Sequence, residues 1–141
     1  MLVTLKGSSD PIDAWTHKLH FELPALYFDD GDYTVALRSI FLDVDNDDNS
    51  RPDYHLYSLQ TDLVDKSVIN PKQEIVSFSR TIQRGSGYNY IFYEPALLRK
   101  YKIQLPSLKS TEFILSTTQP DTKISFDFVE ILLEITRYAR I

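Results

Sequence analysis

The chain of 141 residues contains no cysteine and only four glycines, one methionine and one tryptophan. The lack of cysteine excludes disulfide bonds, thiolate metal ligands and thiol catalysis. No apolar run reaches the ~18 residues expected of a membrane-spanning helix. The N-terminus, MLVTLKGSSDP, lacks the basic leader and apolar stretch of a signal peptide. We therefore expect neither a membrane span nor a cleaved leader.

Positive charge is also scarce, because 15 Lys and Arg face 20 Asp and Glu and give a net charge of −5. A protein that binds a nucleic-acid duplex needs clustered Lys and Arg to displace counterions. The nearest approach to such a cluster is sparse and consists of Arg99, Lys100, Lys102 and Lys109. We do not expect nucleic acid as the main partner.

Aromatic residues are abundant, at 13 % of the chain. They favour β structure, where flat side chains pack well on pleated faces. The length fits one domain spanning residues 1–141, large enough to bury a core without covalent staples. Neither an internal repeat nor a linker divides the sequence.

Short apolar runs alternate with turn residues about every ten residues, as in β-sandwiches and barrels. The alternation predicts strands at 2–6, 16–23, 33–42, 54–64, 74–80, 88–93, 101–105 and 111–117. In the clearest of them, 33–42, the period of two places Tyr33, Val35, Leu37 and Phe41 on one face. Arg38 falls on the other face.

The last stretch, ISFDFVEILLEITRYARI at 124–141, fits two structures. A strand places Val129, Ile131, Leu133 and Ile135 on one face, whereas a helix aligns a polar stripe. The β-branched residues favour the strand. A short helix is predicted at 95–100, where Pro95 suits a first-turn position. Together these features predict an all-β, single-domain, antiparallel, jelly-roll-like β-sandwich of about eight or nine strands with at most one short helix.

The stretch DVDNDDN at 43–49 crowds aspartates into one segment. A calcium-binding EF-hand loop needs a central glycine and a terminal glutamate. Neither a register starting at Asp43 nor one starting at Asp45 supplies them. We interpret 43–49 as a solvent-facing loop between the strands 33–42 and 54–64, and a looser Ca²⁺ site remains the alternative.

The three histidines do not predict a metal site. His17 and His20 are three residues apart, so on a strand they point to opposite faces and cannot share an ion. His55 stands alone in another strand pattern. We assign no metal ligand and no cofactor-binding residue.

Catalytic motifs are missing as well. Gly85-Ser86-Gly87 lacks the spacing of a nucleophile elbow, and no phosphate-binding loop or dinucleotide fingerprint occurs. Asp62 and Asp65 form a possible acid pair only across a predicted strand end. We assign no catalytic residue and do not expect an enzyme.

Tyrosines 88, 90 and 93 suggest two uses. Stacked tyrosines bind sugars, but the same residues fit a sandwich core or a subunit interface, where Tyr is enriched. Both readings stay open.

Three segments carry a resemblance: FDDGDYTVALRSIFLD, PDYHLYSLQTDLVDKSVINPKQEIVSFSRT and YKIQLPSLKSTEFILSTTQPDTKISFDFVEILLEI. Their spaced residues, over about residues 1–138, resemble the small jelly-roll capsid-type proteins of polinton-like elements, virophages and related double-stranded DNA viruses. The matching positions are Tyr33, Val35, Leu37, Ser39, Asp62-Leu63-Val64, Phe113-Ile114-Leu115, Ile124, Phe126 and Ile131-Leu132-Leu133.

The resemblance implies a virion structural protein, either a vertex (penton-type) or a minor capsid subunit, located in the virion after assembly in the host cell. Its partners would be itself, as a homo-oligomer, and other capsid proteins. It also implies that the last stretch is a strand. The alternative is a β-sandwich binding module, such as a receptor- or carbohydrate-binding head or an adaptor.

Overall fold

The computed structural model describes residues 1–8, 10–11, 16–22, 31–46, 53–64, 69–82, 88–105, 110–117 and 124–137. This part of the chain is all β and contains no helix, hence none long and apolar enough to cross a membrane. The strands are β1 Leu2–Gly7, β2 Asp10–Pro11, β3 Thr16–Glu22, β4 Gly31–Asn46, β5 Asp53–Thr61, β6 Glu74–Ile82, β7 Tyr88–Tyr93, β8 Tyr101–Leu105, β9 Ser110–Thr117 and β10 Ile124–Arg137.

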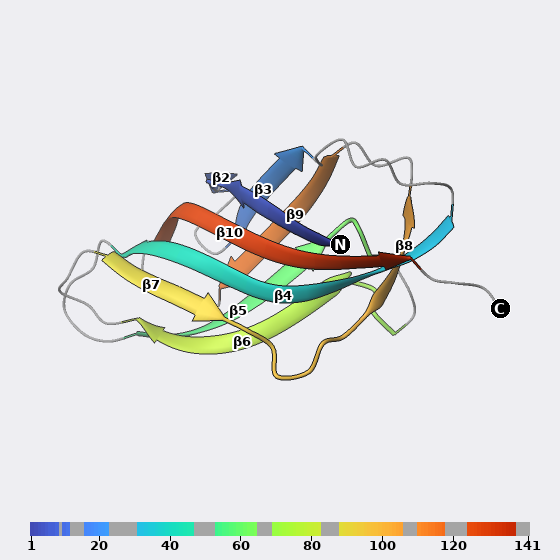
Figure 1. Ribbon diagram of the computed structural model, residues 1–141. Coiled ribbons are helices and arrows are strands. Elements are labelled where there is room, and N and C mark those ends of the chain that lie inside the picture. The colour runs from blue at the N-terminus through green and yellow to red at the C-terminus, as the bar shows by residue number, and fades with distance from the viewer. Residues whose placement is uncertain are drawn as a thin grey trace.

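The strands form two five-stranded antiparallel sheets that pack face to face (Figure 1). Sheet A has the order β1-β10-β4-β7, and β8 also pairs with β4. Sheet B has the order β2-β3-β9-β5-β6. The predicted antiparallel β-sandwich is therefore confirmed.

The pairing is nested along the chain. β1 pairs with β10, β3 with β9, β4 with β7 and β8, and β5 with β6. A long antiparallel ribbon wrapped in this way into two sheets is a jelly roll. The four pairs alternate between sheets A and B, so each sheet receives strands from both halves of the chain.

One edge of sheet A is interrupted. β7 pairs with β4 from Ile40 to Asp45, and β8 pairs with β4 from Gly31 to Val35. Between them, residues 94–100 leave the sheet as a non-helical segment. The predicted helix at 95–100 is wrong. Six residues are too few to form a helix without a packed apolar face, and Leu97 is 83 % exposed.

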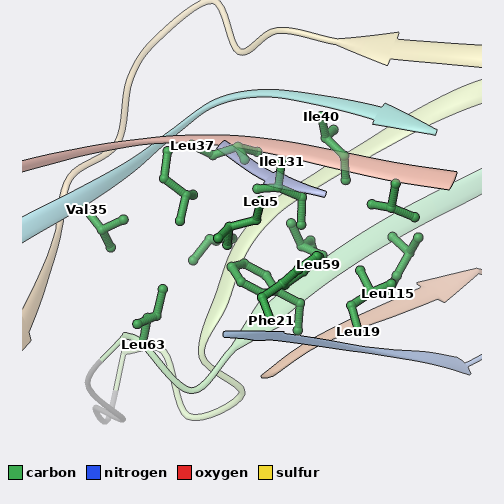
Figure 2. Close-up of a cluster of buried hydrophobic side chains, with 14 of the residues drawn as sticks. Leu5, Leu19, Phe21, Val35, Leu37, Ile40, Leu59, Leu63, Leu115 and Ile131 are labelled. Carbon is green, nitrogen blue, oxygen red and sulfur yellow. The ribbon is translucent and has the colours of Figure 1, made fainter. Parts of the chain in front are cut away.

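The core lies between the sheets and is built from alternate residues of both (Figure 2). Val129, Ile131, Leu133 and Ile135 of β10 are all buried, and β10 pairs with both β1 and β4. The strand interpretation of this stretch is confirmed and the helix alternative is wrong. Sheet B contributes Leu19, Leu59 and Leu115, which are fully buried opposite them.

A β-bulge interrupts the alternation of β4. Opposite β10, Ser39 pairs with Leu132 and Leu37 pairs with the next residue, Leu133, so Arg38 has no counterpart. Because of this extra residue, Leu37 and Ile40 both point into the core. Phe41 then points outward, so the prediction that it shares a face with Leu37 is wrong.

The aspartate-rich stretch belongs partly to β4. This strand continues through Asn46, and Asp43 pairs with Phe128 on one side and Tyr90 on the other. The prediction of a loop is therefore wrong for residues 43–46, because pairing with β10, and with β7 as far as Asp45, extends the strand despite its polar composition. Residues 47–49 lie outside the described part.

The two sheets also meet along both long edges. Tyr93 of β7 stacks on Phe78 of β6, with ring centroids 4.4 Å apart and an interplanar angle of 5°. At the opposite edge, β1 lies against β3, where a Cβ on Gly7 would come within 3.2 Å of the Phe21 ring. These contacts close the core at its sides.

Candidate functional site

Five side chains gather on the outer face of sheet A, near the end where β7 pairs with β4. The β pairing aligns Tyr90, Asp43 and Phe128 in one row across β7, β4 and β10. The next row holds Phe92 and Phe41. We call Phe41, Asp43, Tyr90, Phe92 and Phe128 the aromatic–acidic patch. Tyr90 and Phe92 are 69 % and 56 % exposed, although they are large apolar side chains.

The rings of the patch contact one another around Phe41. The Phe41 ring stacks on Tyr90 at 5.7 Å and 25°, and it lies 6.2 Å from Phe128 at 60°. Neighbouring rings on adjacent strands stabilise each other, but here they still leave a wide apolar surface in contact with water. A contiguous exposed aromatic surface of this kind is typical of binding interfaces.

Asp43 gives the patch its charge. One of its carboxylate oxygens, Oδ1, is buried and accepts no hydrogen bond. An acceptor removed from water without a donor costs free energy, so the placement of this oxygen lowers the stability of the fold. The exposed ring faces beside Asp43 suit a guanidinium or ammonium group, which stacks on aromatic rings.

A second exposed group lies along the same edge of sheet A. Residues 97–100, LLRK, belong to the segment that leaves the sheet between β7 and β8, and all four side chains are exposed. None of the ion pairs found among the described residues involves Arg99 or Lys100. We call residues 97–100 the LLRK segment.

Beside the LLRK segment is an open cavity of about 690 Å³ between the edges of the two sheets. Its lining includes Leu37, Ile75, Tyr93, Leu97 and Tyr101. The cavity is mostly apolar and leads from the interrupted edge of sheet A towards β6.

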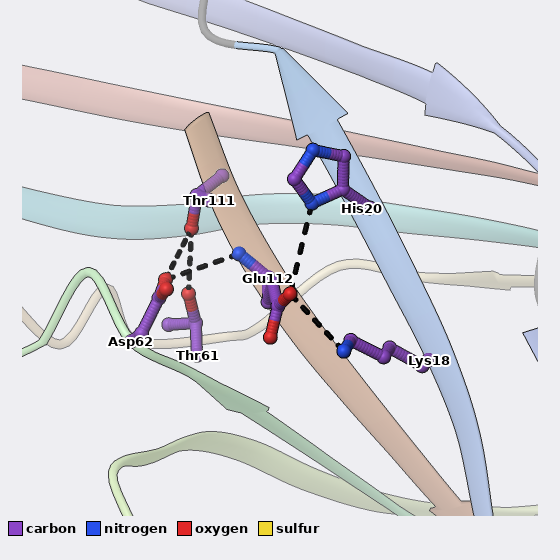
Figure 3. A network of polar contacts seen from close by, with 6 residues as sticks. All are labelled: Lys18, His20, Thr61, Asp62, Thr111 and Glu112. Carbon is purple, nitrogen blue, oxygen red and sulfur yellow. Dashed lines mark hydrogen bonds and ion pairs between the residues drawn. The ribbon is translucent and has the colours of Figure 1, made fainter. Parts of the chain in front are cut away.

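A polar network joins β5 to β9 on the other sheet (Figure 3). Asp62 Oδ1 accepts hydrogen bonds from Thr111 Oγ1 at 2.7 Å and from the Glu112 backbone N–H at 3.1 Å. The buried Thr61 hydroxyl lies 3.3 Å from that of Thr111. Asp62 therefore anchors the end of β5 to β9, which is a structural use of the carboxylate. Asp65, the other half of the predicted acid pair, lies outside the described residues.

The same network continues onto the surface of sheet B. Glu112 Oε1 lies 3.1 Å from Lys18 Nζ and 3.8 Å from His20 Nδ1 (Figure 3). All three side chains are substantially exposed, so these ion pairs contribute little to stability. They do not form a pocket.

His17 and His20 lie on opposite faces of β3, as expected. His17 is 2 % exposed and meets the Phe126 ring edge-on at 4.7 Å, whereas His20 is on the outer face of the same strand. The side chain of His55 lies outside the described part. Within that part, no three His, Cys, Asp or Glu side chains gather as a metal site would require.

Tyr90 and Tyr93, which the sequence analysis placed in one group, lie on opposite faces of β7. Tyr90 faces outward into the patch, whereas Tyr93 faces the sandwich interior and stacks on Phe78. The side chain of Tyr88 and the whole of Gly85-Ser86-Gly87 lie outside the described residues. Sequence reasoning missed Phe41 and Phe128 as surface residues, and no local signal marks the bulge that turns Phe41 outward.

Tyr57 is the one described residue whose titration is clearly shifted. Burial raises the pKa of its phenol well above the usual range. Its ring stacks on Phe78 at 5.3 Å and meets Phe126 edge-on at 6.3 Å. These contacts place Tyr57 in the core rather than in a reactive site.

No protein-family model matches the sequence, and no curated protein is significantly similar to it. Among solved structures, the chain is similar to the crystal structure of dimeric latent PorU from Porphyromonas gingivalis, with a TM-score of 0.48 and 11 % identity. The match covers 96 % of this chain and 12 % of PorU, so this chain corresponds to a small part of that protein. A likeness this distant says nothing about what the chain does.

Proposed function

We propose that the chain is a virion structural protein, a jelly-roll subunit of a capsid shell in a vertex (penton-type) or minor capsid position. It acts through self-assembly and through contacts with other capsid proteins, and it resides in the virion. The observation that carries the proposal is the aromatic–acidic patch on the outer face of a jelly roll whose core is already closed. The resemblance to jelly-roll capsid-type proteins supports the same role.

The patch favours a protein partner for a physical reason. Phe41, Tyr90 and Phe92 take no part in the core, which the inward residues of both sheets fill. Apolar side chains exposed in this way gain free energy when another surface covers them, at about 25 cal/mol per Å². Tyr and Phe are among the residues enriched at such interfaces.

The test is assembly of the purified chain, measured by light scattering over a range of concentrations and followed by electron microscopy of the particles. We expect a defined homo-oligomer that is weakened by Tyr90→Ser with Phe92→Ser. The matched control is Leu56→Ser, which removes an exposed apolar side chain from sheet B. A chain that stays monomeric at high concentration and forms no particles would contradict the proposal.

The alternative, a carbohydrate- or receptor-binding head, uses the same exposed ring of Tyr90. Under this alternative the chain binds glycans on an array, and Tyr90→Ala abolishes that binding while self-association is unchanged. An array without hits, together with assembly that depends on Tyr90, favours the capsid role.

A further inference from the structure

We propose that the cavity between β6 and residues 94–101 binds an extended, acidic peptide of a partner protein, which adds a strand to the free edge of β6. We call this cavity of about 690 Å³ the edge groove. The inference goes beyond the proposed function and does not depend on it, because peptide binding here requires neither a capsid nor a second copy of the chain.

The backbone of β6 forms one wall of the edge groove. Among the described strands, β6 is the last of sheet B on its side (Figure 1). Four consecutive residues, 74–77, line the groove. Since the side chains of a strand alternate between its two faces, a consecutive run indicates that the backbone edge borders the cavity. The groove therefore gives access to strand backbone.

The hydrogen bonds of β5 show which neighbour each of its residues serves. The Thr61 N–H donates to the Gln73 carbonyl on the side of β6, whereas the next N–H, of Asp62, donates to the Glu112 carbonyl of β9. The backbone groups of successive strand residues point to opposite sides, and the pairing of β5 with β9 keeps one register from residue 57 to residue 61. The odd-numbered residues of this stretch therefore bond to β6 and the even-numbered ones to β9.

Ser77 consequently directs its backbone towards the open side. It lies opposite Ser58, an even-numbered residue that bonds to β9. The N–H and C=O of Ser77 therefore point away from β5, on the side where the groove lies, and the residue is exposed. A strand that enters the groove can bond to both groups, which is the mode of recognition called β-augmentation.

The same edge already holds a substitute for a strand at Glu74. Asn70 Nδ2 donates to the Glu74 carbonyl at 2.9 Å, and Asn70 Oδ1 accepts from the Glu74 N–H at 3.0 Å. A residue of a paired strand makes these same two bonds, so the Asn70 amide takes the place of a neighbouring strand there. It covers the edge at Glu74 and leaves Ser77 for an incoming chain.

The floor and the rim of the groove are apolar. The floor includes Leu37 and Ile75, which are buried, and Tyr93, which packs against the core. Ile69 and Leu97 line the groove as well, and at 96 % and 83 % they are the most exposed large apolar side chains of the described part. Apolar surface of this kind gains free energy when a partner covers it. Alternate side chains of a bound peptide cover it, while the others face water.

The charges of the groove favour an acidic peptide. Lys72 and Arg99 line it from the two sides, both are exposed, and the ion pairs found in the described part of the chain involve neither. The carboxylate of Glu74 is turned towards β5, where Oε2 accepts a hydrogen bond of 2.9 Å from the Ser58 hydroxyl. Asp or Glu in the peptide supplies the partners that the two cations lack.

The test begins with an unbiased library of seven-residue peptides displayed on phage, with the full chain as bait. The β6 residues in the wall span about 13 Å at ~3.3 Å per residue, so seven residues reach across the groove. We expect enriched peptides that alternate apolar residues and carry Asp or Glu. The affinity of the most enriched peptide, made synthetically, is then measured by fluorescence anisotropy. No enrichment, or enrichment of basic peptides, overturns the proposal.

Two substitutions of one residue test the strand addition. Ser77→Pro removes the outward N–H, and proline is tolerated in an edge strand where the lost N–H faces away from the ladder. Ser77→Ala keeps the N–H and removes only the hydroxyl. We expect the proline variant to bind the peptide about tenfold or more weakly and the alanine variant to bind like the wild type. Equal affinities of all three chains overturn the strand addition and leave at most a side-chain contact in the groove.

Two neighbouring cations test the role of charge. Arg99 lines the groove, whereas Lys100, the next residue, does not. We expect Arg99→Glu to weaken binding about fivefold or more, and Lys100→Glu to weaken it by less than about twofold. Equal effects of the two variants overturn the pairing of the peptide with Arg99.

Amide hydrogen exchange, followed by NMR, tests the same contact in the wild-type chain. The outward N–H of Ser77 should exchange about tenfold or more slowly once the chain is saturated with the peptide. An unchanged rate overturns the strand addition, even where circular dichroism shows that Ser77→Pro does not fold. A chain that assembles into particles but binds no peptide overturns this inference and leaves the capsid role standing.

Discussion

The bulge at Arg38 can be tested by truncating Ile40 and Phe41, which lie just beyond it in β4. In the observed register Ile40 is fully buried and Phe41 lies on the outer face. Ile40→Ala removes three buried carbons, which cost about 2.4 kcal/mol at ~0.8 kcal/mol each. The remaining cavity adds to this loss, so we expect a decrease of about 3 kcal/mol in the free energy of unfolding.

Phe41→Ala is the matched comparison. It removes a larger side chain, but one that is partly exposed and contacts mainly the Tyr90 and Phe128 rings. We expect a loss of only about 1 kcal/mol, of the size of such ring contacts. The measurement is equilibrium urea denaturation, followed by tryptophan fluorescence and far-UV circular dichroism.

An unbroken strand alternation predicts the reverse order, because it places Phe41 in the core with Leu37. If Phe41→Ala costs more than Ile40→Ala, the bulge is in the wrong place and the aromatic–acidic patch loses its central residue. Measuring both variants at low protein concentration keeps self-association from adding to either value.

Three further results are expected. Asp62→Ala should lower the free energy of unfolding by about 1–3 kcal/mol, because it removes the acceptor of two hydrogen bonds. The control Lys18→Ala should lower it by less than ~0.5 kcal/mol. Equal losses for the two variants would argue against the anchoring role of Asp62. Since burial raises the pKa of Tyr57, the contribution of this residue to stability is complete below the unfolded pKa of about 10 and declines as the pH rises further. In pH-dependent denaturation, Tyr57→Phe should make the decrease in the free energy of unfolding above this pH shallower. An unchanged slope would contradict this. Tyr93→Ala should lower the melting temperature more than Tyr90→Ala does, because the Tyr93 ring is packed inside on Phe78 whereas the exposed Tyr90 ring contacts only the surface ring of Phe41. Equal shifts would refute that assignment.

The sandwich was predictable because its signal is local. Alternation in β3 and β10 places Leu19, Phe21, Val129 and Ile131 inside, and each is buried. The strand assignment of β10 followed from its β-branched residues. The burial of these residues can be predicted from the pattern of the sequence immediately around them.

The parts that were missed depend on distant pairing. Asp43–Asn46 are strand because β10 pairs with all four residues and β7 with the first three, although their polar composition opposes a strand. The extra residue in β4 is defined only relative to β10. The patch brings together Phe41 of β4, Phe128 of β10 and Tyr90 of β7, so no single segment of the sequence predicts it.

The interrupted edge of sheet A limits how further chains can add to this sheet. A long free strand edge is a template for unlimited addition of further chains, as in fibres. Here the departure of residues 94–100 divides the edge into a six-residue and a five-residue strand, neither of which offers a continuous template. The other edge, β1, is also only six residues long and carries Lys6 near its end. Such short edges do not favour fibril-like growth along sheet A.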